Sequence, residues 1–100
     1  MSFRKLRGVQ LTEEQQGLVR YMCLNEEYLP VRMREKIQRL CDAVGGSYAN
    51  ALWEVMCTKR SITAIAMDHY TSESTLYRLR KEFYECWYLG APRTTRKKAV

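Results

Sequence analysis

Four cysteines and one histidine are the side chains of this sequence that could bind a metal ion, carry a redox reaction or attack a substrate. The cysteines stand at positions 23, 41, 57 and 86, and no two of them have the C-x-x-C spacing of zinc sites and redox motifs. Each has apolar neighbours in a helical pattern, so we expect four reduced, partly buried thiols. The chain also has no phosphate-binding glycine loop and no nucleophile beside a base. The sequence therefore predicts no catalytic residue, no metal site and no cofactor, and the protein is not expected to be an enzyme.

Positive charge collects at the two ends of the chain. The 100 residues carry 17 Lys and Arg against 11 Asp and Glu, for a formal net charge of +6. We expect a basic N-terminal arm at 1–10, a helical domain at 11–89 and a basic C-terminal tail at 90–100. The two ends either contact nucleic-acid phosphates or act as solubilising tails. Their basic residues are Arg4, Lys5, Arg7, Arg93, Arg96, Lys97 and Lys98.

Residues 61–83 combine two helical patterns with a break between them. Ser61 is placed to cap a first helix, and Ala66 supplies the small side chain that two closely crossing helices need. A break at Tyr70-Thr71 follows, and either Thr71 or Ser72 can cap a second helix. Two helices joined by such a short turn form a helix-turn-helix unit. Their inner faces are expected to carry Ile62, Ile65, Leu76, Leu79 and Phe83.

This stretch resembles a known family pattern. The matching residues are Ser61, Ile65-Ala66, Ser72, Thr75, Leu76 and Leu79. They are similar to the helix-turn-helix of region 4 of bacterial sigma factors and of small phage late-gene activators and antiterminators. The preceding residues 48–56 resemble the helix that such proteins place before the motif. His69 stands where the family usually has leucine, and Tyr70 where its turn usually has glycine.

The resemblance implies a sequence-specific DNA-binding regulator of transcription, encoded by a phage or prophage. The helix at about 72–87 would enter the major groove of double-stranded DNA. Arg78 would then bond a guanine through both O6 and N7. His69 is expected to be a half-buried side chain at a helix end, with a phosphate or base contact as the alternative. The implied DNA-binding residues are Ser72, Glu73, Ser74, Thr75, Tyr77, Arg78, Arg80 and Lys81, and plain solvent exposure is the alternative for each.

Helical periodicity also organises the rest of the chain. Thr12 and Gln15 fit a capping box that opens a first helix. A second helix is expected to open at Pro30 and end at Gly45-Gly46, and Ser47 to cap a third. No convincing period-2 strand occurs, so the predicted fold class is all-α, a small four- to five-helix domain that contains a helix-turn-helix. The second helix has a basic face that is either solvated or in contact with phosphates: Arg32, Arg34, Lys36 and Arg39.

Charge and aromatic content bear on the partners. Residues 61–87 carry three basic side chains against four acidic ones, a net charge of −1, so phosphate attraction there is weak. Specific binding would need the basic ends, a homodimer on two half-sites, or RNA polymerase as a co-partner. The run at 83–89 holds too many large apolar groups for one helix face. It is covered either within a self-contained core or by another chain.

Two other functions remain open for this sequence. One is a protein–protein adaptor that acts on RNA polymerase or on a repressor, as an antirepressor does. The other is the DNA-recognition subunit of a phage packaging complex. No apolar run approaches the length of a membrane helix, and the first residues lack a signal-peptide core. We therefore expect no membrane association and a place in the cytoplasm of a bacterial host cell.

Overall fold

The structure is a computed structural model that describes residues 11–89, so the arm and tail predicted at 1–10 and 90–100 lie outside the described residues. Residues 11–89 form five α-helices, two short 3-10 helices and no strand, which confirms the prediction of a small all-α domain. No helix in this range has both the length and the apolar character needed to span a membrane. The α-helices are α1 (Glu13–Leu24), α2 (Val31–Gly45), α3 (Ala49–Cys57), α4 (Ile62–Asp68) and α5 (Glu73–Leu89). The 3-10 helices are η1 (Glu26–Tyr28) and η2 (Gly46–Tyr48).

Helix α1 begins at the predicted capping box. The backbone N–H of Gln15 donates to Thr12 Oγ1 over 3.0 Å, and the backbone N–H of Thr12 donates to Gln15 Oε1 over 2.9 Å. Each bond satisfies a backbone N–H that the first helical turn leaves without an intrahelical partner. The capping box is therefore confirmed.

The end of α2 follows the predicted glycine pair, but the start of α3 does not follow Ser47. Gly46 has a φ of 56°, a left-handed conformation that glycine adopts without steric cost. The chain then continues through η2, so α3 begins only at Ala49. Its backbone start is supported by the N–H of Ala49, which donates to Gly46 O, and no side chain caps α3. The prediction of Ser47 as the N-cap is wrong because a 3-10 turn already bonds the backbone there.

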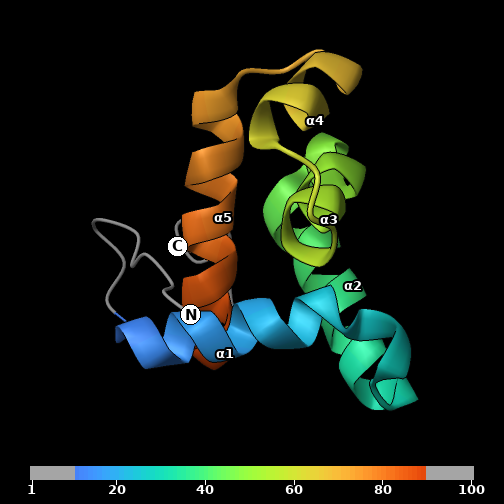
Figure 1. Ribbon diagram of the computed structural model, residues 1–100, viewed down its shortest axis with the longest axis vertical. Helices are drawn as coiled ribbons and strands as arrows, with labels where there is room; N and C mark the ends of the chain where they lie inside the picture. Colours follow the sequence, from blue (N-terminus) through green and yellow to red (C-terminus); the bar gives the residue numbers. More distant parts are fainter. Residues whose placement is uncertain (1–10, 90–100) are drawn as a thin grey trace, which may run out of the picture.

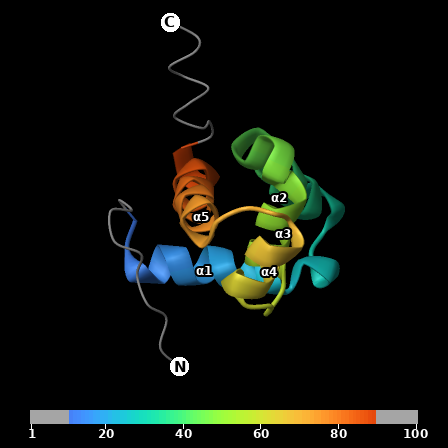
Figure 2. The same cartoon turned by 90° about the horizontal axis from the view of Figure 1, so that it is seen from above.

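The helices enclose one core. Helix α5 stands beside α2, α3 and α4, and α1 crosses it near its C-terminal end (Figures 1 and 2). Helix α4 lies at the opposite, N-terminal end of α5 (Figure 1). Among residues 11–89, the N-terminal half of α5 is therefore packed on one side only. The fully buried side chains with the largest volumes are Tyr84, Phe83, Ile37, Leu52, Met56, Ile65 and Leu76.

The aromatic run at the end of α5 is covered from within the chain. Phe83, Tyr84, Cys86 and Trp87 are all less than 10% exposed, and Tyr88 is 42% exposed. The Tyr88 hydroxyl donates to Gln15 O of α1 over 3.4 Å. Of the two interpretations of this run, the structure supports the self-contained core. The run therefore supplies no argument for a homodimer.

The four cysteines are thiols, as predicted, and none of them is part of a disulfide. Cys23, Cys41 and Cys86 are buried, and Cys57 is partly exposed. The pKa of the Cys23 thiol is raised, first by its hydrogen bond with Cys57 and then by burial, and burial raises the pKa of Cys41. Cys23 and Cys41 therefore stay protonated and act as small core side chains.

Arg20 of α1 closes the C-terminal end of α3. Its guanidinium donates to Val55 O, to Met56 O over 2.7 Å and to Thr58 O over 3.2 Å. The last carbonyls of a helix have no intrahelical partner and carry partial negative charge, so a cation is favourable there. Arg20 thereby fixes α1 to the segment that leads into α4.

Replacing Arg20 with alanine is expected to lower the free energy of unfolding by about 2 kcal/mol, because three part-buried carbonyls would lose a charged donor. Urea denaturation would measure the change. Arg34→Ala is the matched control, since Arg34 is an exposed cation of α2. Equal losses in the two variants would contradict the capping role of Arg20.

Candidate nucleic-acid interface

The candidate site is built on α4, the turn at 69–72 and α5. Ser61 caps α4 as predicted, because its Oγ accepts the backbone N–H of Ala64 over 3.1 Å. Ile65 and Ala66 of α4 are buried. The backbone N–H of Thr71 donates to Ala66 O over 3.0 Å, which folds the chain back from α4 toward α5. Helix α4 thus holds the turn in one place relative to the core.

Tyr70 provides the sharp change of direction in this turn. Its φ is 54°, and no other non-glycine residue among those described has a positive φ. Its side chain is 94% exposed, so packing does not account for the conformation. A left-handed residue with a Cβ costs on the order of 1 kcal/mol relative to glycine. Tyr70 therefore adopts the backbone conformation for which glycine is the usual residue.

The Tyr70→Gly variant is expected to be more stable than the original chain by up to about 1 kcal/mol, because glycine removes the left-handed strain and an exposed ring is lost. Thermal or urea unfolding measures this change. A decrease in stability would show that the exposed ring supports the turn.

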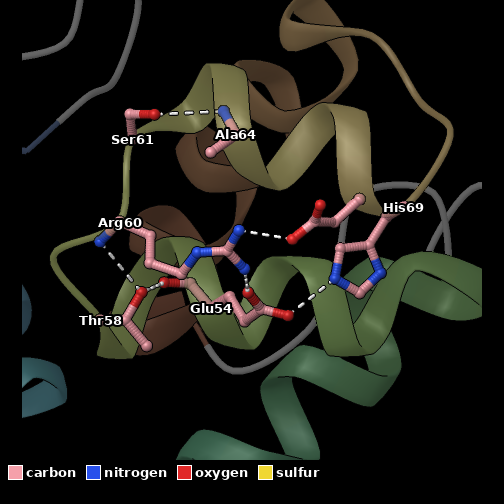
Figure 3. Close-up of polar contacts among 7 residues, drawn as sticks. Glu54, Thr58, Arg60, Ser61, Ala64 and His69 are labelled. Carbon is pink, nitrogen blue, oxygen red and sulfur yellow. Dashed lines mark hydrogen bonds and ion pairs between the residues drawn. The ribbon is translucent and has the colours of Figure 1, made fainter.

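An ionic cluster fixes the end of α4 against α3 (Figure 3). Arg60 bridges the carboxylates of Glu54 and Asp68, and Nε2 of His69 lies 2.7 Å from the second oxygen of Glu54. The side chains of Glu54 and His69 are only 24% and 26% exposed. His69 is thus a half-buried side chain at the helix end, as expected, and its described partner is a carboxylate.

The charge of Glu54 depends on this cluster. Its pKa is lowered from 4.5, mainly by the hydrogen bond with His69; burial acts in the opposite direction, and Arg60 lowers the pKa further. A carboxyl group whose pKa is lower in the folded chain stabilises the fold above its unfolded pKa. That contribution disappears as the pH falls through the folded-state pKa.

The original chain is therefore expected to lose stability below pH 4.5 more steeply than the Glu54→Gln variant. Urea unfolding at about pH 7 and about pH 3.5 measures the difference. Glu27→Gln is the control, because Glu27 is exposed and forms no ion pair within residues 11–89. Identical acid sensitivity in the original chain and Glu54→Gln would contradict the role of the cluster.

The start of α5 is organised by hydroxyl groups. Ser72 Oγ accepts the backbone N–H of Thr75 over 3.1 Å and donates to Thr75 Oγ1 over 2.9 Å. Ser72, rather than Thr71, is therefore the side chain that caps α5. Ser74 Oγ lies 3.1 Å from Ser72 Oγ. Glu73 accepts a hydrogen bond from Thr63 of α4 over 3.0 Å, which ties the two helices together.

The outer face of α5 carries part of the predicted DNA-binding set. Ser74, Tyr77 and Arg78 are exposed, and Lys81 is partly exposed. Ser74, Arg78 and Lys81 follow one another at steps of four and three, so they share one side of the helix. Leu76, Leu79 and Phe83 are buried on the other side, as predicted. We call the group Ser74, Tyr77, Arg78 and Lys81 the outer α5 face.

Arg80 lies differently from Arg78. It is half-buried, and its guanidinium carbon lies 5.2 Å from the centroid of the Tyr77 ring. Its Nε is buried and has no hydrogen-bond partner among the described residues. Burial is the main reason that the pKa of the Arg80 guanidinium is lowered. Of the eight predicted contacts, Ser72, Glu73 and Thr75 also hold the helix start, and Arg80 is partly enclosed.

Several residues that build this site were not predicted. The ionic cluster joins Arg60, in the loop between α3 and α4, to Glu54 six residues before it and Asp68 eight residues after it. No helical period connects these positions. The Thr63–Glu73 bond likewise joins two helices. The contact of Arg20 with the end of α3 was not predicted either. The sequence gives one sign of it, because Arg20 follows the buried Val19 and so lies at the edge of the apolar side of α1.

The described residues contain no group of three or more His, Cys, Asp or Glu side chains that could hold a metal ion. Comparison of the chain with protein-family models, with curated proteins and with solved structures finds no match.

Proposed function

We propose that this protein is a sequence-specific DNA-binding regulator of transcription that inserts the N-terminal half of α5 into the major groove. The observation that carries the proposal is the state of Arg78. It is exposed on the outer α5 face and forms no hydrogen bond or ion pair within residues 11–89. A free guanidinium on a helix can bond guanine O6 and N7 at once.

The surrounding geometry supports the same function. Helix α5 stands with its N-terminal half packed on one side, so a groove has access to the other (Figure 1). Buried Leu76 and Leu79 fix the rotation of the helix, and the Ser72 cap and the Glu73–Thr63 bond fix its start. A recognition element that is rigid before binding loses little conformational entropy when it binds. The assignment to a phage or prophage rests on the sequence resemblance alone.

Selection from a random library of DNA duplexes at two salt concentrations tests this function. The proposal expects one enriched motif, with binding that survives at the higher salt concentration. Binding without any enriched motif, lost steeply with salt, would show that the chain attaches to DNA only through general charge attraction. A homodimer would enrich two copies of one half-site at a fixed spacing, whereas a co-operating RNA polymerase would raise the affinity for the DNA.

An adaptor that binds a protein is the second candidate, and the exposed tip of the α4 turn favours it. Met67 is 72% exposed and Tyr70 is 94% exposed, so the end of α4 and the turn after it present two large side chains to solvent. Aromatic residues and methionine are enriched in protein interfaces. An adaptor acting on RNA polymerase or a repressor would keep its partner when Arg78 and Lys81 are reversed to Glu, and lose it when Met67 and Tyr70 become Ser. A DNA-binding regulator would show the opposite pattern.

A further inference from the structure

A hollow on the first half of α2 is lined mostly by cationic side chains. Its volume is about 490 Å³. Three cations and one carboxylate surround it, which gives it a local charge of +2, and two apolar side chains complete its wall. The lining residues are Pro30, Arg32, Met33, Glu35, Lys36 and Arg39.

The three cations of the hollow share one side of the helix. Arg32, Lys36 and Arg39 are separated by four and three residues, the spacing of neighbours on a helix surface. None of them forms an ion pair within residues 11–89. Glu35 also forms no ion pair there, so it leaves the three positive charges available to a ligand.

Lys36 is held in place rather than free in solvent. Its Nζ lies 4.0 Å from the centroid of the Trp87 ring, and Trp87 is only 7% exposed. An ammonium group over the face of an indole ring is attracted by the ring. The ligand-binding charge is thereby positioned before any ligand arrives. Arg34 of the same helix is exposed and does not line the hollow. The hollow is therefore formed by particular cations of α2 and not by all of them.

We propose that this hollow binds a phosphate group. Two guanidinium groups and one ammonium group can together donate hydrogen bonds to several oxygens of a phosphate. A carboxylate ligand has only two oxygens and would leave some of these donors without a partner. The phosphate can come from the backbone of a nucleic acid or from a free phosphate compound. The site is separate from the outer α5 face and therefore goes beyond the function proposed above.

The hollow and the outer α5 face are associated with different sides of α5. Lys36 contacts Trp87, which is nine residues beyond Arg78 on α5. At about 3.6 residues per turn, nine residues are about two and a half turns, so Trp87 and Arg78 point to opposite sides of the helix. Trp87 is accordingly buried and Arg78 exposed. The phosphate contact is therefore separate from the base contact of Arg78, and the two tests below decide between a nucleic-acid phosphate and a free phosphate compound.

The first test compares the salt dependence of binding to an unrelated DNA duplex for two variants of the full chain. R32Q/R39Q removes two cations of the hollow, and R34Q removes a cation of the same helix outside it. The slope of log K against log salt is negative, and the loss of one phosphate contact is expected to make it shallower by about 0.9 in R32Q/R39Q. A much smaller change is expected in R34Q. Far-UV circular dichroism checks that α2 remains helical in both.

The second test titrates the original chain with inorganic phosphate and follows backbone amide signals by NMR. Saturable shifts at 30–39 that are lost in R32Q/R39Q support the site, and an unchanged DNA slope in that variant then identifies a free phosphate compound as the source. Equal slopes for the two variants together with no saturable shift would overturn the proposal. Neither test depends on an enriched DNA motif, so failure of the α5 proposal is distinguishable from failure of this one.

Discussion

Replacing Arg78 with alanine is expected to weaken binding to the enriched DNA motif by about 5- to 150-fold, equivalent to about 1–3 kcal/mol. Arg78 is exposed and forms no ion pair within residues 11–89, so its loss should leave the fold unchanged. The effect should be confined to the base pair that Arg78 contacts, and the preference at that position should relax. Competition binding with duplexes that differ at single positions measures both effects.

Arg34→Ala is the control for this experiment. It also removes one exposed positive charge, but from α2 and outside the phosphate hollow. General charge attraction predicts that the two variants lose the same affinity for all duplexes alike. That outcome would contradict base recognition by Arg78.

Replacing Phe83 with alanine is expected to have the largest effect on stability, a loss of about 3–5 kcal/mol in the free energy of unfolding. Phe83 is 0% exposed, and its ring lies 6.1 Å from that of Trp87, so the truncation leaves a cavity where α5 meets the core. Domains of this kind are stable by only about 5–15 kcal/mol, so a substantial fraction of the total would be lost. Urea unfolding measures it.

Tyr77→Ala is the matched control for Phe83, because Tyr77 is an aromatic residue of the same helix that is 41% exposed. A loss below about 1 kcal/mol is expected there. Similar losses for Phe83 and Tyr77 would contradict the assignment of the inner and outer sides of α5. The DNA motif that the Phe83 variant prefers should be unchanged, since only the folded population falls.

The elements could be predicted because local chemistry sets their ends. Thr12 and Gln15 bond each other within one helical turn, and Gly46 takes a conformation that other residues rarely adopt. The buried side of α5 follows the three- and four-residue steps of Leu76, Leu79 and Phe83. Ser47 shows the limit of such signals, since its type suits a helix cap but the preceding glycines allow a 3-10 turn.

The contacts between elements could not be predicted from the sequence in the same way. Arg20 meets the carbonyls of α3 at a separation of more than thirty residues, which depends on how two helices cross. His69 also depends on a distant partner, because a polar side chain is acceptable at a half-buried position when a carboxylate such as that of Glu54 bonds it.

The predicted DNA-binding residues differ in their exposure. Arg78, Tyr77 and Ser74 are exposed, whereas Arg80 lies beside the Tyr77 ring and is half-buried. Both arginines follow the same helix two residues apart, so they fall on different sides of it. Helical periodicity assigns Arg78 and Arg80 to different sides of α5. The packing of the folded chain then determines which of the two is exposed to solvent.

The most direct measurement is an NMR titration of the chain with the enriched duplex, followed through backbone amide signals. The largest shifts are expected at 72–81, where the cap of α5 and the outer α5 face lie. A second group at 30–39 is expected where the phosphate hollow contacts the same duplex. Shifts confined to α1, or confined to Met67 and Tyr70 with α5 unchanged, would contradict recognition of DNA by α5.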